Sequence, residues 1–238
     1  MPDPARSFFA PAVRAVSLLQ AADLDALSNG GCTVLIESGG EDAPPDGREQ
    51  EQTEAVRLYA LFPPEARTTG ILLGLCLTTG SACTHDIPAV IIAGLRHQGV
   101  TAACGSTRLH TALHEAIVNA LIHGNLELAS PRRDDPADFC AFGDAIAERL
   151  ADPTYNRRYL WISLCPPARP GEGARLLVRN EGSGFNPASL PPQERRRPER
   201  AHGGWALILA GCERATFSPD GKTLTLTLHP ESTASDPA

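Results

Sequence analysis

The sequence predicts an α+β fold, a two-layer α/β sandwich whose helices pack on one face of a mixed, mostly antiparallel sheet. Hydrophobic residues make up 42% of the 238-residue chain, enough to build a core. A strongly amphipathic helix is expected near the middle of the chain. The predicted elements after residue 70 follow the order strand, helix, helix, helix, strand, strand, helix, strand, which favours this architecture.

The central helix is predicted over Leu109–Asn125. Its apolar residues recur at steps of three and four, as in a helix with one face on a core: Leu109, Ala112, Leu113, Ala116, Ile117, Ala120 and Leu121. Glu115, Asn119 and His123 are spaced by four residues and form a polar line along one side. We expect Gly124 to end the helix in the left-handed conformation that glycine tolerates.

Local patterns place the remaining elements on both sides of this helix. Alternating or continuous apolar runs predict strands at Ile71–Thr78, Tyr159–Leu164, Leu176–Arg179 and Leu224–Leu228. Helical periodicity predicts helices at Ile87–Gln98, Phe139–Leu150 and Trp205–Cys212. Thr84 or Asp86 can cap the first of these. Asn186–His202, rich in Pro, Arg and Glu, has no hydrophobic period.

The chain divides into a small N-terminal module of unknown role at residues 1–68, a main domain at 69–230 and a disordered tail at 231–238. The module is expected to hold a helix at Ser17–Leu27 and strands at Cys32–Ile36 and Ala55–Phe62, with a polar connection at Gly39–Gln52. Three interpretations of it stay open: a sensory or docking module, a degenerate remnant, or an extension of the following sheet.

Composition excludes several classes of protein. A net charge of −7 argues against nucleic acid as the main partner. No apolar run reaches about 18 residues, so no membrane span is expected, and the N-terminus does not resemble a secretory signal. The seven cysteines are scattered, odd in number and never spaced as C-x-x-C, which favours reduced thiols. We therefore expect a cytoplasmic protein.

The polar line of the central helix is the first candidate for chemistry. The Asn119 side-chain oxygen suits a magnesium ion that keeps its waters and nucleotide phosphates, and Glu115 can accept a proton from a hydroxyl group attacking the same phosphate. The alternative is a polar side that is simply solvated. His110 and His114 lack the H-E-x-x-H order and a nearby third ligand, so a histidine metal site is disfavoured.

Two glycine motifs follow. Asn180-Glu181-Gly182-Ser183-Gly184-Phe185 comes directly after a predicted strand, where glycines let the backbone approach a flat ligand and a polar side chain can bond its edge. His202-Gly203-Gly204-Trp205 opens a predicted helix, whose backbone N–H groups can seat a phosphate. Each motif alone also fits an ordinary turn or helix entry.

In this order, the three motifs resemble those of the GHKL ATP-binding family, whose fold is shared by histidine kinases and DNA gyrase, and most closely its anti-sigma factor serine kinase branch. The resemblance covers roughly residues 70–230 and implies a Bergerat-type histidine kinase-like ATPase domain that binds ATP and Mg²⁺. Its N-box is similar to H-E-A-I-V-N-A-L-I-H-G-N. The match implies Glu115 as general base, Asn119 as magnesium ligand, and His123 and Gly124 as phosphate-side neighbours.

The resemblance also implies roles for the glycine motifs. Gly182 and Gly184 stand in the family's D-x-G-x-G-F box, with Asn180 where the family has the aspartate that reads the adenine amino group. Gly203 and Gly204 would seat phosphates. Thr223, in a G-x-T sequence, is similar to a residue that helps to bind adenine. The segment Asn186–His202 would form a mobile lid, in which Arg195, Arg196, Arg197 and Arg200 can clamp a triphosphate.

Three functions are considered. The first is an ATP/Mg-dependent protein serine kinase of the anti-sigma type, which the resemblance implies to be a homodimer that binds a sigma-like factor or antagonist regulator. The second is a nucleotide-insensitive regulatory module, favoured by three departures from the family pattern: Asn180, Trp205 and Ala206. The third is a histidine kinase phosphorylated on His85. It is disfavoured because His85 lies only 29 residues before His114, too few for a phosphoacceptor hairpin.

Overall fold

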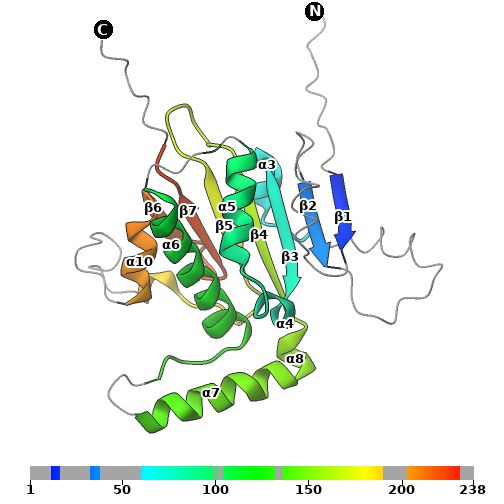
Figure 1. Ribbon diagram of the computed structural model, residues 1–238, viewed down its shortest axis with the longest axis vertical. Coiled ribbons are helices and arrows are strands. Elements are labelled where there is room, and N and C mark those ends of the chain that lie inside the picture. The colour runs from blue at the N-terminus through cyan, green and yellow to red at the C-terminus, as the bar shows by residue number, and fades with distance from the viewer. Residues whose placement is uncertain are drawn as a thin grey trace, which may run out of the picture.

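The computed structural model describes residues 12–16, 33–37, 60–98, 100, 104–131, 136–189 and 203–230. One twisted sheet forms the first layer, and α5 (Ile87–His97), α6 (Ser106–Asn119) and α10 (Gly204–Ala210) form the second (Figure 1). The predicted α+β class is confirmed. In the described part of the chain, no helix combines the length and apolar character needed to cross a membrane.

The sheet has seven strands in the order β1-β2-β3-β4-β5-β7-β6. The strands are β1 (Ala12–Val16), β2 (Thr33–Glu37), β3 (Leu73–Thr78), β4 (Tyr159–Cys165), β5 (Arg175–Arg179), β6 (Arg214–Phe217) and β7 (Thr223–Thr227). β1, β2 and β3 are parallel, and every pair from β3 to β6 is antiparallel. The prediction of a mixed, mostly antiparallel sheet is therefore confirmed.

Alternation along the strands separates two apolar faces. On β4, Leu160, Ile162 and Leu164 point toward the helices and join the larger core cluster. Trp161 and Cys165 point to the opposite face, where Phe62 and Ala66 cover them beside the short helix α3 (Pro64–Thr69). The prediction placed helices on one face only; α3 on the second face is a correction, which its short, weakly periodic sequence did not reveal.

The strands predicted at residues 71–78, 159–164, 176–179 and 224–228 are confirmed as β3, β4, β5 and β7. The helix predicted at 87–98 is α5, and Asp86 caps it by accepting a hydrogen bond from Ala89 N at 3.2 Å. The helices predicted at 139–150 and 205–212 are α7 (Pro136–Ala151) and α10. The sequence did not predict β1, β6, α3, α4 (Thr79–Ala82) or α8 (Pro153–Asn156).

Parts of the N-terminal prediction lie outside the described residues: 17–27, 39–52 and 55–59. The strand expected at 32–36 is β2, and both β1 and β2 extend the sheet beyond β3. Of the three interpretations of residues 1–68, this pairing supports the extension of the sheet. The division at residue 68 stays a prediction. The tail at 231–238 also lies outside the described residues.

The central helix runs to Asn125, but its last turn is wider than predicted. After α6, residues Ala120–Asn125 form a π-helical turn, η2. Gly124 lies inside this turn and is not among the described glycines with positive φ, so the predicted left-handed ending at Gly124 is wrong. A π-helical turn changes the direction of the side chains that follow it. Here it carries Asn125 into the interior.

Asn125 is fully buried and joins four parts of the chain. Its Nδ2 donates to Thr79 Oγ1 at 2.8 Å and to the Tyr159 carbonyl at 3.1 Å, while its Oδ1 accepts from Glu181 N at 2.7 Å. Its own carbonyl accepts from Arg158 Nη1 at 2.6 Å. This one side chain therefore ties the end of the central helix to α4, β4 and the loop after β5.

Asn125→Ala is expected to lower the free energy of unfolding by about 3 kcal/mol, because it leaves buried donors and acceptors unpaired. Asn119→Ala is the matched control on the same helix. The Asn119 side chain has no hydrogen-bond partner among the described residues, so its loss should change stability by less than about 0.5 kcal/mol. Urea unfolding of both variants measures the difference, and equal effects would contradict the assignment.

Candidate functional site

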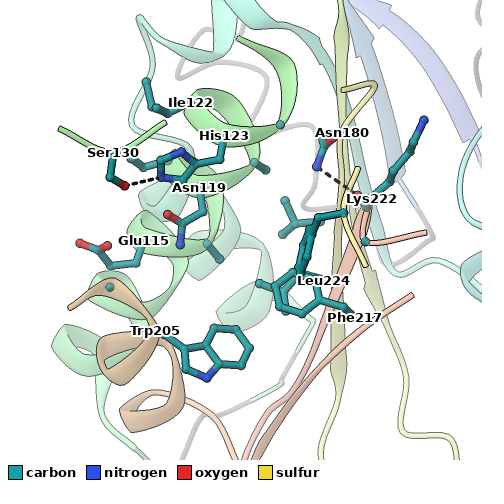
Figure 2. A pocket seen from close by; sticks show the side chains of 18 of the residues that line it. Glu115, Asn119, Ile122, His123, Ser130, Asn180, Trp205, Phe217, Lys222 and Leu224 are labelled. Carbon is teal, nitrogen blue, oxygen red and sulfur yellow. Dashed lines mark hydrogen bonds between the residues drawn. The ribbon is translucent and has the colours of Figure 1, made fainter. Parts of the chain in front are cut away.

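A cavity of about 750 Å³ opens between α6 and the sheet. Its walls come from α6 and η2, from the strand ends at β5, β6 and β7, and from the start of α10 (Figure 2). The predicted site residues that line it are Glu115, Asn119, His123, Gly124, Asn180, Gly184 and Gly204. Three motifs that are far apart in the chain therefore meet at one site.

Glu115 and Asn119 project from one side of α6, and both line this cavity (Figure 2). Both residues are half-buried, and neither side chain has a hydrogen bond or an ion pair within the described part of the chain. A Cβ added at Gly204 would collide with the Glu115 carboxylate, so glycine allows α10 to begin directly against it. The cavity thus holds a carboxylate and an amide that have no partner among the described residues.

An aromatic surface faces these polar groups. Trp205 stacks on Phe217 with ring centroids 5.4 Å apart and an interplanar angle of 20°, and Phe185 meets Phe217 edge-on at 4.9 Å. All three rings line the cavity, next to Leu224. The sequence marks Trp205 only as a departure from the family pattern, and it did not reveal Phe217 because β6 was not predicted. The short alternating run at residues 214–217 was the available signal.

Asn180 is held in one orientation by the backbone. Its Nδ2 donates to the Lys222 carbonyl at 3.2 Å, and its Oδ1 accepts from Gly182 N at 3.0 Å. The residue is 9% exposed and lines the cavity. A carboxylate at this position would lack the N–H that Lys222 requires, so the amide has a structural reason to be here.

Two of the predicted site glycines serve packing. A Cβ on Gly124 would collide with the Asn180 side chain, and a Cβ on Gly182 would collide with the Gly124 backbone. Gly182 does not appear in the cavity wall. These two glycines let η2 and the loop after β5 pack backbone against backbone. Gly184, with φ 77°, continues this loop and lies against the turn between β6 and β7.

The imidazole of His123 is engaged with the loop that follows η2. Its Nδ1 lies 2.6 Å from the Leu128 carbonyl, which can only accept, so Nδ1 carries the proton. Nε2 lies 3.2 Å from Ser130 Oγ. Beyond this loop, Phe139 and Phe142 of α7 form the outer part of the cavity wall, and no residue of α7 is buried. The sequence did not place α7 at the site.

Three further predicted residues or segments lie elsewhere. Thr223 does not line the cavity: its Oγ1 accepts from Arg179 Nη1 at 3.4 Å, on the sheet face opposite Leu224. Gly203 is the N-cap of α10, with φ 65°, and lies just outside the wall. Most of the segment 186–202, with its four arginines, lies outside the described residues.

The histidines considered for a metal site are separate from the cavity. His110 Nε2 pairs with Asp86 Oδ1 at 3.3 Å, next to the N-terminus of α5. Within the described ranges, no group of three or more His, Cys, Asp or Glu side chains is arranged to hold a metal ion. A cation at Asn119 would therefore need ligands from a bound molecule and water.

Comparisons of the chain with protein-family models, with curated proteins and with solved structures each found no match. A function is therefore inferred from the site itself. The arrangement offers a flat apolar surface, the carboxylate of Glu115 as a proton acceptor and the side-chain oxygen of Asn119 as a metal ligand, all at one cavity.

Gly124→Ala is expected to destabilise the protein by about 1–3 kcal/mol, because the added methyl group must displace Asn180. Gly143→Ala on α7 is the matched control. A Cβ at Gly143 meets nothing within 4 Å, so this change should stabilise the helix by up to about 1 kcal/mol. Thermal unfolding distinguishes the two, and a neutral Gly124→Ala would contradict the packing.

Proposed function

We propose that this protein is an ATP- and magnesium-binding regulatory protein serine kinase of the anti-sigma type, with a GHKL-like site at this cavity. The observation that carries the proposal is the pair Glu115 and Asn119. Both side chains face the cavity from one side of α6 and have no other partner within the described residues. Half-buried polar side chains that line a cavity without a protein partner are available to bind a ligand there.

In this proposal, the adenine ring of ATP packs on the aromatic surface of Trp205 and Phe217. The rest of the nucleotide lies across the cavity toward α6. Asn119 would supply one oxygen ligand to a magnesium ion that is held mainly by phosphates and water. The ion would neutralise charge on the transferring phosphoryl group. Glu115, one helical turn away, would accept the proton of the attacking serine hydroxyl. The serine belongs to a partner regulator.

A second candidate function is a nucleotide-insensitive regulator that keeps the fold and binds a protein partner. Asn180 favours this alternative, because an uncharged amide stands where the family has a carboxylate, and part of its hydrogen-bonding capacity is used by the backbone. The close approach of Gly204 to Glu115 favours it too, since a phosphate at the start of α10 would lie near a carboxylate.

Isothermal calorimetry tests the first proposal. Wild-type protein should bind ATP more tightly with magnesium than with a chelator, and Asn119→Ala should remove most of this difference, about tenfold or 1.4 kcal/mol. Glu148→Gln, an exposed change on α7 outside the cavity wall, is the control and should bind as wild type does. If the protein does not bind ATP at millimolar concentration, the kinase proposal is wrong.

Glu115→Gln separates chemistry from binding. The amide has the same shape but cannot accept the proton, so phosphoryl transfer should fall by about 10²-fold or more while MgATP affinity stays within about threefold. Release of labelled phosphate or its transfer to a serine-bearing partner measures this. The regulator alternative makes the opposite prediction, namely that Glu115→Ala leaves partner binding and cellular output unchanged.

A further inference from the structure

The sheet end of the cavity can accommodate a flat ring, but it has few polar groups that could distinguish one ring from another. Phe217, Trp205 and Leu224 give an apolar surface there. Stacking on such a surface tolerates any planar ring, because every base has a π-face. Recognition of one base over another must therefore come from polar groups at this end, either backbone groups or side chains.

Among the described residues of the cavity wall, the polar side chains at the sheet end are Asn180 and Lys222. Figure 2 shows the amino group of Lys222 directed away from Leu224 and Phe217, with Asn180 beside them. The other polar side chains of the wall lie on α6, in η2 or in the loop that follows η2, and the indole of Trp205 belongs to α10. Asn180 is thus the side chain placed to bond the edge of a ring on this surface.

The remaining hydrogen-bonding capacity of Asn180 follows from its two backbone bonds. A side-chain amide has two N–H donors and two oxygen lone pairs. One donor goes to the Lys222 carbonyl, and one lone pair accepts from Gly182 N. One N–H and one lone pair remain. The amide cannot flip without losing both backbone bonds, so it offers a bound ring one fixed donor and one fixed acceptor.

This pair does not choose between the two purines. Adenine presents an amino donor next to a ring-nitrogen acceptor, and guanine presents a ring N–H donor next to a carbonyl acceptor. Each set matches one donor and one acceptor, with the base turned over between the two cases. A carboxylate would offer acceptors only. We propose that Asn180 makes this a purine-tolerant site that takes guanine nucleotides about as well as adenine nucleotides.

This inference rests on the proposed function, and its test keeps the two distinguishable. Calorimetric titrations with MgATP and MgGTP on the wild-type protein should give dissociation constants within about tenfold of each other. If neither nucleotide binds at millimolar concentration, the proposed function fails and the inference fails with it. If MgATP binds and MgGTP is weaker by more than about tenfold, the proposed function survives and purine tolerance is overturned.

A variant tests whether Asn180 is responsible. Asn180→Leu removes the remaining donor and acceptor together, so affinity for MgATP and MgGTP should fall by the same factor, about tenfold. A fall for MgATP alone would overturn the assignment. Thermal unfolding without nucleotide shows whether the variant folds; if it does not, the wild-type ratio decides the inference. Glu148→Gln again serves as the unaffected control.

Discussion

The structure depends on the contact between the end of the central helix and the loop after β5. The side chain of Asn125 is fully buried there and makes three hydrogen bonds. Gly124 and Gly182 remove the side chains that would hold the two segments apart. Without this contact, α6 would still pack on the sheet through its apolar stripe, but its polar side would not be fixed relative to the strand ends. The cavity between them exists because this junction sets its width.

The same junction divides the motif residues into two groups. Gly124, Gly182 and Asn180 hold elements together, and each has contacts that account for its residue type. Glu115 and Asn119 contribute nothing of this kind within the described residues. Free polar side chains reduce neither strain nor exposed apolar area, so stability does not explain them. The separation between tied and free residues is the strongest reason to assign chemistry to α6.

The second set of contacts around the site belongs to the segment between η2 and β4. Glu127 accepts a hydrogen bond from Ser183 N at 3.0 Å, which connects this segment to the loop after β5. Glu127 also forms an ion pair with Arg158 at 3.1 Å. α7 lies apart from the sheet (Figure 1) and has no buried residue, and its Phe139 and Phe142 line the cavity. An element that contributes so little to the core can shift without unfolding the domain. The exposed Phe139 of α7 lines the cavity, so a molecule bound there would contact it.

The sequence by itself determined the elements that carry strong periodicity. The stripe of α6 follows from its helical periodicity, because that helix buries one face and exposes the other. The strands β3, β4, β5 and β7 follow from short apolar runs, whose residues are buried on both faces of the sheet. The cap of α5 follows from the Asp that precedes it. β6 and α3 were missed because elements of four and six residues have too few periods to register. The polar line of Glu115 and Asn119 was also visible, because positions four apart share a helix side.

Tertiary structure alone decided what the other site residues do. Whether a glycine approaches a ligand or a neighbouring backbone depends on what lies opposite, and for Gly124 and Gly182 the neighbour is protein. Whether Thr223 faces the cavity depends on strand register, and a shift of one residue exchanges the faces. Asn180 could be predicted as polar and near a ring, but the bonds to Lys222 and Gly182 that fix its amide come from the partners that folding brings to it.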